Sequence, residues 1–114
     1  MTAATSPGRH PRHGLDDVIH APIRFSIVAT LSGVDRADFS FVRDTVEISD
    51  SALSKQIAVL EQAGYVKVKK GYVGKRPRTW FSLTPTGRSA YGSHLAALTE
   101  IANLATPGSG GQPS

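Results

Sequence analysis

Two segments of alternating apolar and polar residues lie on either side of a pair of glycines in residues 65–84, YVKVKKGYVGKRPRTWFSLT. Successive side chains of a β-strand point to opposite faces, so this alternation gives each strand one apolar face. The apolar positions that we expect to face a core are Val66, Val68, Phe81 and Leu83. Gly71 and Gly74 lie between the segments, where a turn needs backbone angles that other residues avoid. The pattern predicts a β-hairpin with a tip of about eight residues.

The hairpin follows directly on the best-defined helical segment of the chain, SDSALSKQIAVLEQAG. Ser49 is a good N-cap and Gly64 is a C-terminal stop, so the segment predicts a helix over residues 49–63. Its apolar stripe consists of Leu53, Ile57 and Leu60. The opposite side has small or polar residues: Ser51, Ser54, Lys55, Ala58 and Gln62. Such a face suits insertion into a DNA major groove, although an ordinary surface helix would show the same pattern.

Two further helices are predicted before residue 49. Pro22 suits the first position of a helix over about residues 22–32, because its missing N–H costs nothing there, and Gly33 ends this helix. Its expected core residues are Ile23, Phe25, Ile27, Val28 and Leu31. The next helix is expected to have Ser40 as its N-cap, with Phe39, Val42 and Val46 directed inward. The predicted order is helix, short turn, helix and hairpin, which is the winged-helix order.

Positive charge is concentrated in the hairpin and the segment after it. The chain has a formal net charge of +4, yet residues 66–99 contain no Asp or Glu. Their cations are Lys67, Lys69, Lys70, Lys75, Arg76, Arg78 and Arg88. Such segregation is typical of a surface that binds a polyanion. A solvated basic loop is the alternative interpretation.

Four parts of the sequence together resemble the winged-helix transcriptional regulators of the MarR/ArsR type, and most closely their small winged helix DNA-binding domain branch. In chain order they are HAPIRFSIVATL, LSKQIAVLEQAGYV, GKRPRTWFSLT and LTPTGR. The resemblance covers residues 15–100 and depends on the order and spacing of these parts. It implies an α+β, mostly helical fold: a winged helix-turn-helix with a two- or three-stranded antiparallel wing and a C-terminal dimerisation helix.

The resemblance also implies a homodimeric DNA-binding regulator, often a repressor and sometimes released by a small molecule. We therefore expect helix 49–63 to read the major groove of a pseudo-palindromic operator, and the wing, residues 70–79, to contact the backbone or minor groove. The expected DNA-binding residues are Ser49, Ser51, Ser54, Lys55, Lys69, Lys75, Arg76 and Arg78. Lys55 has the length and charge to reach guanine O6 and N7. The chain lacks the cysteines of metal-sensing relatives, and no effector site is visible in it.

The last helix is predicted to have Thr84 as its N-cap and Pro85 at its first position. Because a domain of about 85 ordered residues has little core left to cover the apolar stripe of this helix, we expect the stripe to pack against a second copy of the chain. The expected dimerisation residues are Leu15, Val18, Ile19, Tyr91, Leu95, Leu98 and Ala102. Packing within the chain, onto helix 22–32, is the alternative.

Composition sets the remaining expectations. Tails rich in Pro, Gly, Ser and Thr are expected at residues 1–13 and 106–114, on either side of one domain at residues 14–105. The sequence has no cysteine, no long apolar run and no secretory signal pattern, so we expect a cytoplasmic protein.

No motif of the sequence points to an enzyme, and we expect no metal or cofactor. His20 and His94 are expected to pack or cap rather than to catalyse. A winged helix that contacts protein or RNA instead of an operator is the alternative function. RNA binding would favour exposed aromatic residues for stacking, and Tyr72 and Trp80 are the candidates.

Overall fold

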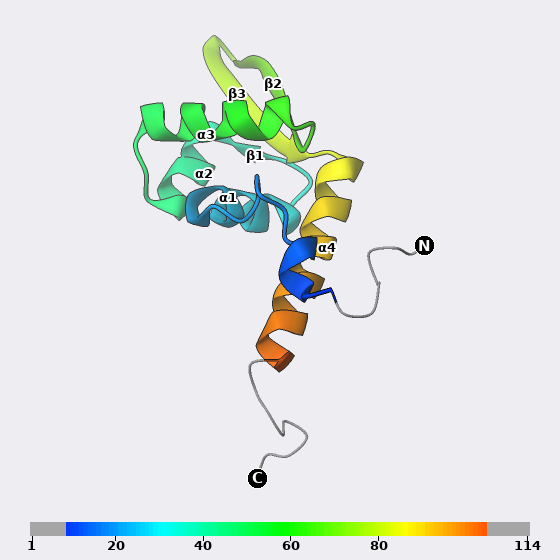
Figure 1. Ribbon diagram of the computed structural model, residues 1–114. Coiled ribbons are helices and arrows are strands. Elements are labelled where there is room, and N and C mark those ends of the chain that lie inside the picture. The colour runs from blue at the N-terminus through cyan, green and yellow to red at the C-terminus, as the bar shows by residue number, and fades with distance from the viewer. Residues whose placement is uncertain (1–8, 105–114) are drawn as a thin grey trace.

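The computed structural model describes residues 9–104, which fold into four α-helices and a three-stranded antiparallel sheet (Figure 1). The elements are a 3-10 helix (Pro11–Gly14), α1 (Pro22–Ser32), β1 (Ala37–Asp38), α2 (Phe39–Val46), α3 (Asp50–Gln62), β2 (Val66–Val73), β3 (Arg76–Leu83) and α4 (Pro85–Leu104). The strand order is β1-β3-β2.

The predicted α+β winged-helix fold is confirmed. Residues 1–8 of the tail expected at 1–13, and the whole tail expected at 106–114, lie outside the described residues. No helix within the described range is long and apolar enough to cross a membrane.

Helix α1 begins at Pro22 and ends before Gly33, as predicted. Its buried residues are Ile27, Val28 and Leu31. Ile23 is 38% exposed, so its assignment to the core is wrong. Phe25, also predicted in the core, is partly buried and packs against it.

Side-chain caps fix the starts of α2 and α3. Asp38 Oδ1 accepts a hydrogen bond from the Phe41 N–H at 3.1 Å, so α2 begins one residue after Asp38. The prediction of Ser40 as this N-cap is wrong, because the carboxylate two residues earlier caps the helix and also accepts from the Ser40 hydroxyl. Ser49 Oγ accepts from the Ala52 N–H at 3.1 Å, which confirms Ser49 as the N-cap of α3.

Strands β2 and β3 form a hairpin whose turn is tighter than predicted. They pair from Val66 opposite Leu83 to Val73 opposite Arg76, so only residues 74 and 75 form the turn. The expected tip of about eight residues is wrong, because the strands continue through the basic segment to a two-residue loop, the commonest hairpin connection.

The two glycines of the hairpin have different roles. Gly74 has a φ of 63°, in the left-handed region that a tight hairpin turn requires. Gly71 lies within β2, opposite Arg78, so its prediction as a turn residue is wrong. A Cβ at position 71 would come within 3.1 Å of the Trp80 ring, so the glycine makes room for the indole.

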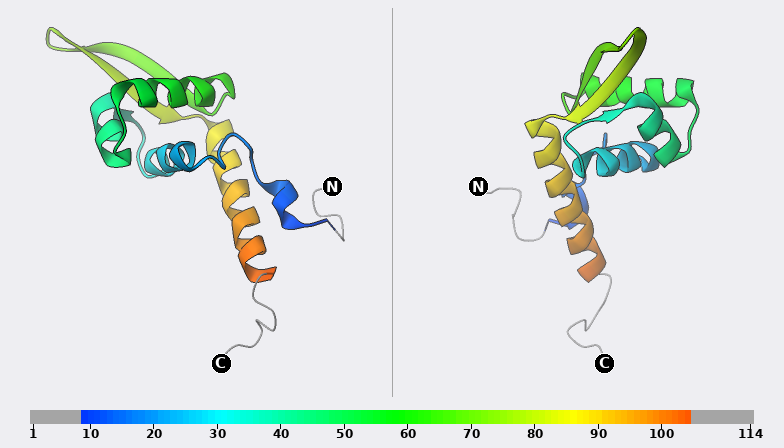
Figure 2. Two further views of the ribbon diagram at one scale, coloured as in Figure 1. Left: turned by 60° about the vertical axis from the view of Figure 1, so that its left-hand side comes forward. Right: turned by 180° about the vertical axis from the view of Figure 1, so that it is seen from behind.

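Helix α4 follows the sheet and runs away from the body of the molecule (Figures 1 and 2). The Thr84 hydroxyl accepts from the Gly87 N–H at 2.9 Å, which confirms Thr84 as the N-cap. The residues that α4 buries within the chain are Gly87, His94 and Ala97. The predicted stripe lies to one side of these: Leu95 is 37% exposed, and Tyr91 packs half-buried against Phe25 with ring centroids 5.9 Å apart.

The N-terminal segment packs onto α4 and into the core. Residues 11–14 form the 3-10 helix beside α4, although 11–13 were predicted as part of a tail. A Cβ on Gly14 would lie 3.4 Å from that of Ala97. Ile19, predicted at a dimer interface, is completely buried in the core of its own chain and is unavailable to a partner. The Asp16 carboxylate accepts from the N–H groups of Val18 and Ile19, which turns the segment inward.

Asp16 joins this segment to α4 and to the start of the hairpin. Its N–H donates to His94 Nδ1 at 3.0 Å, and its carboxylate accepts from the Tyr65 hydroxyl. The hydrogen bond to Asp16 raises the pKa of Tyr65 to about 12. His94 is 1% exposed. Burial, helped by the charge of neighbouring His20, lowers the pKa of His94 below its usual 6.5. The expectation that His94 packs is confirmed.

Gly87→Ala is expected to destabilise the fold by ~1–3 kcal/mol or more, because the added Cβ would lie 2.2 Å from the Tyr65 carbonyl oxygen. The carbonyl belongs to the backbone and the Cβ is bonded directly to it, so neither can move cheaply. Gly92→Ala in the same helix is the matched control, since its Cβ would meet no atom within 4 Å and alanine favours a helix by about 1 kcal/mol over glycine. Urea unfolding measures both, and equal stabilities of the two variants would contradict this account.

The free energy of unfolding is expected to fall as the pH drops below about 6.5, because His94 has a lower pKa in the folded chain than in the unfolded chain. In that window the unfolded chain binds more protons. Protonation of Nδ1 also removes the acceptor for the Asp16 N–H. Urea titrations from pH 8 to 5.5 should show a smaller decline in His94→Gln than in wild type or in His20→Gln. An identical decline in all three proteins would mean that His94 is not responsible.

Candidate nucleic-acid interface

The exposed face of α3 is set by the burial of its opposite face. Leu53, Ile57 and Leu60 are buried as predicted. The residues turned outward, all exposed, are Ser51, Ser54, Lys55, Ala58 and Gln62. Ser49 uses its hydroxyl to cap α3, which leaves it less free for a ligand than predicted. Within residues 9–104, Lys55 makes no hydrogen bond or ion pair, so its ammonium is available.

Two arginines hold α3 against neighbouring helices. Arg43 of α2 donates to Asp50 Oδ1 at 2.9 Å, in the first turn of α3. Arg24 of α1 donates to Gln56 Oε1 at 2.9 Å and to the Val18 carbonyl at 2.6 Å. These contacts fix the position of α3 without using its outward residues.

The register of the hairpin divides its side chains between two faces. Residues directly opposite each other in an antiparallel pair lie on the same face. The face on the α3 side has Val66, Val68, Lys70 and Tyr72 from β2, with Leu83, Phe81, Thr79 and Pro77 opposite them. The other face, here called the back face, has Lys67, Lys69, Gly71 and Val73 from β2, with Ser82, Trp80, Arg78 and Arg76 opposite them.

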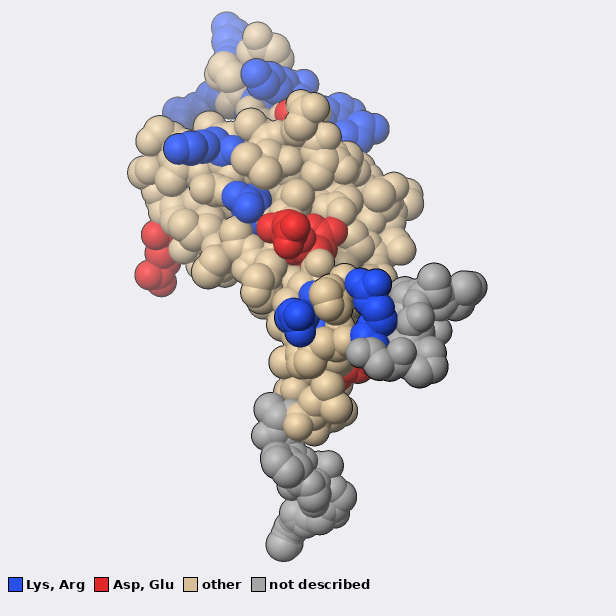
Figure 3. Space-filling model, in the orientation of Figure 1, with Lys and Arg blue, Asp and Glu red and all other residues tan. Residues whose placement is uncertain are grey.

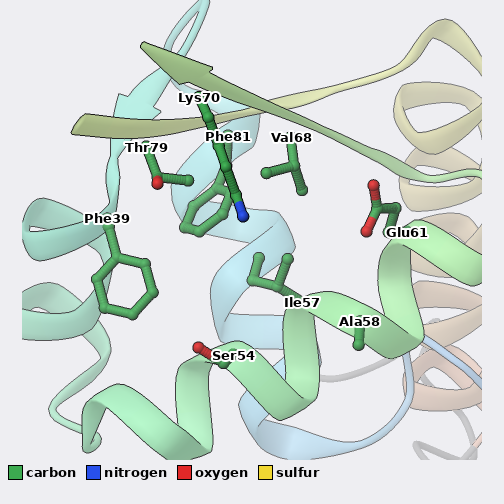
Figure 4. Close-up of a pocket in the computed structure, with 9 residues that line it drawn as sticks. All are labelled: Phe39, Ser54, Ile57, Ala58, Glu61, Val68, Lys70, Thr79 and Phe81. Carbon is green, nitrogen blue, oxygen red and sulfur yellow. The ribbon is translucent and has the colours of Figure 1, made fainter. Parts of the chain in front are cut away.

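A hollow of about 280 Å³ lies between α3 and the hairpin (Figure 4). Its apolar lining residues are Phe39, Ile57, Ala58, Val68 and Phe81, and its polar ones are Ser54, Glu61, Lys70 and Thr79. The Lys70 side chain points from β2 toward α3 (Figure 4). Lys70 therefore shares a surface with Ser54, although Lys69 was predicted in its place. The alternation of β2 contains the signal that was missed, since Lys70 is in phase with Val66 and Val68.

The other predicted hairpin cations occupy three different settings. Lys75 lies in the turn and Arg76 directly beside it, and both are exposed. Lys69 lies on the back face, away from α3. Arg78 forms an ion pair with Asp38, at 3.6 Å between Nη1 and Oδ2, which ties it to the body of the molecule. The structure thus brings Ser54 and Lys70 to one hollow, leaves Ser51 and Lys55 exposed on α3, and places Lys75 and Arg76 at the far end of the hairpin.

The surface at this end of the molecule is positively charged. Lys and Arg side chains gather over the hairpin in Figure 3, where almost no acid is visible. Elsewhere in the described chain, His20 and His94 lie edge to face with ring centroids 5.3 Å apart. No group of three potential metal ligands occurs among residues 9–104.

The sequence matches the winged helix DNA-binding domain family over residues 23–102. An uncharacterised protein of Methanocaldococcus jannaschii is 24% identical over 84 residues, which are 74% of this chain and 91% of that protein. A transcriptional regulator homologue from Pyrococcus horikoshii OT3, known from its structure, is 27% identical with a TM-score of 0.73. The match covers 77% of this chain and 87% of that one.

More distant solved structures share the fold. The M. tuberculosis transcriptional regulator MosR, in complex with DNA, is 20% identical with a TM-score of 0.62, covering 87% of this chain and 68% of its own. A MarR-family regulator from Silicibacter pomeroyi is 19% identical with a TM-score of 0.59. The match covers 87% of this chain and 66% of that one. These neighbours are transcriptional regulators rather than enzymes, and they confirm the predicted resemblance to the MarR type. Because the family match spans most of the sequence, the chain belongs to the winged helix DNA-binding domain family.

Proposed function

We propose that the protein is a homodimeric transcriptional regulator that binds an operator in double-stranded DNA and acts as a repressor. The observation that carries this proposal is the exposed N-terminal half of α3, where Lys55 is exposed and the preceding residue, Ser54, lines a hollow shared with Lys70 of the basic hairpin. Small side chains around one lysine let a helix approach base edges in the major groove. The DNA complex of the M. tuberculosis regulator, which has the same fold, supports this reading of α3.

In this proposal α3 reads bases and the hairpin binds the DNA backbone. Lys55 donates to O6 and N7 of a guanine, and Ser54 contacts a base or a phosphate. Lys70, Lys75 and Arg76 bind phosphates or the adjoining minor groove. Lys69 has no role in operator binding because it faces away from α3. Arg78 has a smaller role than predicted from the sequence because it is paired with Asp38.

Helix α4 supports the homodimer. Its C-terminal half projects from the body of the molecule (Figure 2) and has partly exposed apolar residues, with Leu95 37% and Leu104 59% exposed. Leu98 is half-buried and lies one turn from Leu95 on the same side of the helix. Tyr91 and Val18 pack against the core of their own chain, so the proposed interface is centred on the leucines. Two chains joined in this way would present their α3 helices to successive major grooves.

Selection of bound duplexes from a random library tests the function as a whole. The expected winner is an inverted repeat with half-sites about 10 base pairs apart, because two-fold symmetry in the protein requires it in the DNA. A reporter promoter overlapped by the selected site should be transcribed less when the protein is present. Recovery of no preferred duplex would contradict the proposal.

Lys55→Ala is expected to relax base preference at one symmetric operator position by ~1–3 kcal/mol, because it removes the contact to guanine. Most non-specific affinity should remain. Lys75→Ala removes the same charge from the hairpin turn and is the matched control, which should weaken binding to all duplexes alike. Binding across a library of single-base operator variants measures both. An unchanged preference profile for Lys55→Ala would assign the reading role to another residue.

Replacing Leu95 and Leu98 with glutamate is expected to give monomers and to weaken operator binding strongly, since charges cannot be buried unpaired between two α4 helices. Ser93→Glu with Ala96→Glu adds the same charge to exposed positions elsewhere on the helix and should leave the dimer intact. Equilibrium sedimentation measures the mass of each protein. A monomeric wild type at tens of micromolar would rule out the dimer.

A further inference from the structure

A second basic surface covers the back face of the hairpin, on the opposite side of the sheet from α3. Its exposed cations are Lys67, Lys69 and Arg76 from the hairpin, joined by Arg36, which precedes β1. Lys67 and Lys69 are two residues apart in β2, so their side chains leave the same face about 7 Å apart. The proposed operator contacts use Arg76 at the end of the hairpin but leave Lys67, Lys69 and Arg36 unused.

Trp80 organises the middle of this surface. The edge of its ring fits over Gly71, where a Cβ would be only 3.1 Å away. The Arg36 guanidinium lies over the ring with its Cζ 4.7 Å from the centroid, a cation–π contact that fixes the charge at the sheet surface. Lys69 lies directly opposite Trp80 in the register, so two cations adjoin one indole. The middle of this surface is therefore held in place by the contacts of Trp80 with Gly71 and Arg36.

The acid on this face does not neutralise these cations. Asp38, opposite Trp80 in the register of β1 and β3, pairs with Arg78 at 3.6 Å. Within residues 9–104, Lys67, Lys69 and Arg76 form no ion pair. Like charges held together on a sheet repel one another, and a polyanion relieves that repulsion. No ion pair within the described residues therefore accounts for the presence of Lys67 and Lys69 on this face.

One duplex cannot reach both basic surfaces fully. A duplex seated on α3 meets the α3 side of the hairpin, where Lys70 points toward the helix (Figure 4). The sheet itself stands between that duplex and Lys67 or Lys69, as the two faces of the register require. Figures 1 and 2 show the hairpin extending beyond α3, so its back is not covered by another element.

We propose that the back face binds the phosphate backbone of a second DNA duplex, so that a protein seated on its operator holds another DNA segment. This inference rests on the proposed function. Duplex DNA fits better than a single strand, because single-strand sites offer open aromatic faces for bases, whereas a ring face of Trp80 is already covered by Arg36.

A bead-capture experiment tests this surface. The selected operator duplex is tethered, the protein is loaded, and a fluorescent duplex of unrelated sequence is added at low salt. Wild type should retain the fluorescent duplex. Lys67→Gln with Lys69→Gln should lose at least tenfold of this capture per bound protein, with unchanged affinity and salt slope on a short operator duplex. Lys70→Gln with Lys75→Gln removes two cations of each chain outside the back face. It should lower the salt slope of the dimer on its operator by about four, one for each lost phosphate contact, and keep the capture.

The outcomes separate the two proposals. A wild type that does not load onto the tethered operator contradicts the proposed function, and the second-duplex site with it. Normal loading without capture, or capture that survives Lys67→Gln with Lys69→Gln, overturns the second site alone. If Lys67→Gln with Lys69→Gln lowers the salt slope on a short operator duplex, the second site is also overturned, because the lysines would then contact the first duplex. Capture of a single strand but not of a duplex would assign the surface to a different nucleic acid.

Discussion

The rotation of α3 about its own axis is the constraint on which the proposed interface depends. Leu53, Ile57 and Leu60 are buried, and each such side chain contributes roughly 1.5–3 kcal/mol by leaving water. Turning the helix by one residue, about 100°, would expose this stripe. Lys55 points outward because these leucines and the isoleucine point inward. The surface proposed to face DNA is thus specified by the core, with no residue of that surface needed to form it.

Features that depend on neighbouring residues were predictable from the sequence. Pro22, Ser49 and Thr84 begin their helices as expected, because the relevant groups lie within three residues of each cap. The start of α2 was misplaced at Ser40, because Asp38, two residues earlier, caps the helix in the structure. Which side of α4 packs within its own chain was not predicted from the sequence. His94 is buried because Asp16, seventy-eight residues earlier in the chain, donates to it, and helical periodicity contains no such information.

The candidate site divides in the same way. The outward residues of α3 followed from its apolar spacing, and Lys70 could have been found from the alternation of β2. The ion pair between Arg78 and Asp38 could not be predicted from the sequence, because it forms only when β1 pairs with the edge of β3. The cluster of cations in the sequence therefore predicted a positively charged surface. It did not predict how the cations divide between the two faces of the hairpin.

Asp38 serves the helix-turn-helix and the hairpin at once. Its carboxylate holds the first turn of α2 through Phe41 and also holds Arg78 of β3. Its backbone is part of β1, which pairs with the same strand. Bending of the hairpin thus pulls on the group that keeps α2 wound, and loosening of α2 frees the base of the hairpin. The orientation of the hairpin is therefore coupled to the start of α2, because Asp38 holds both.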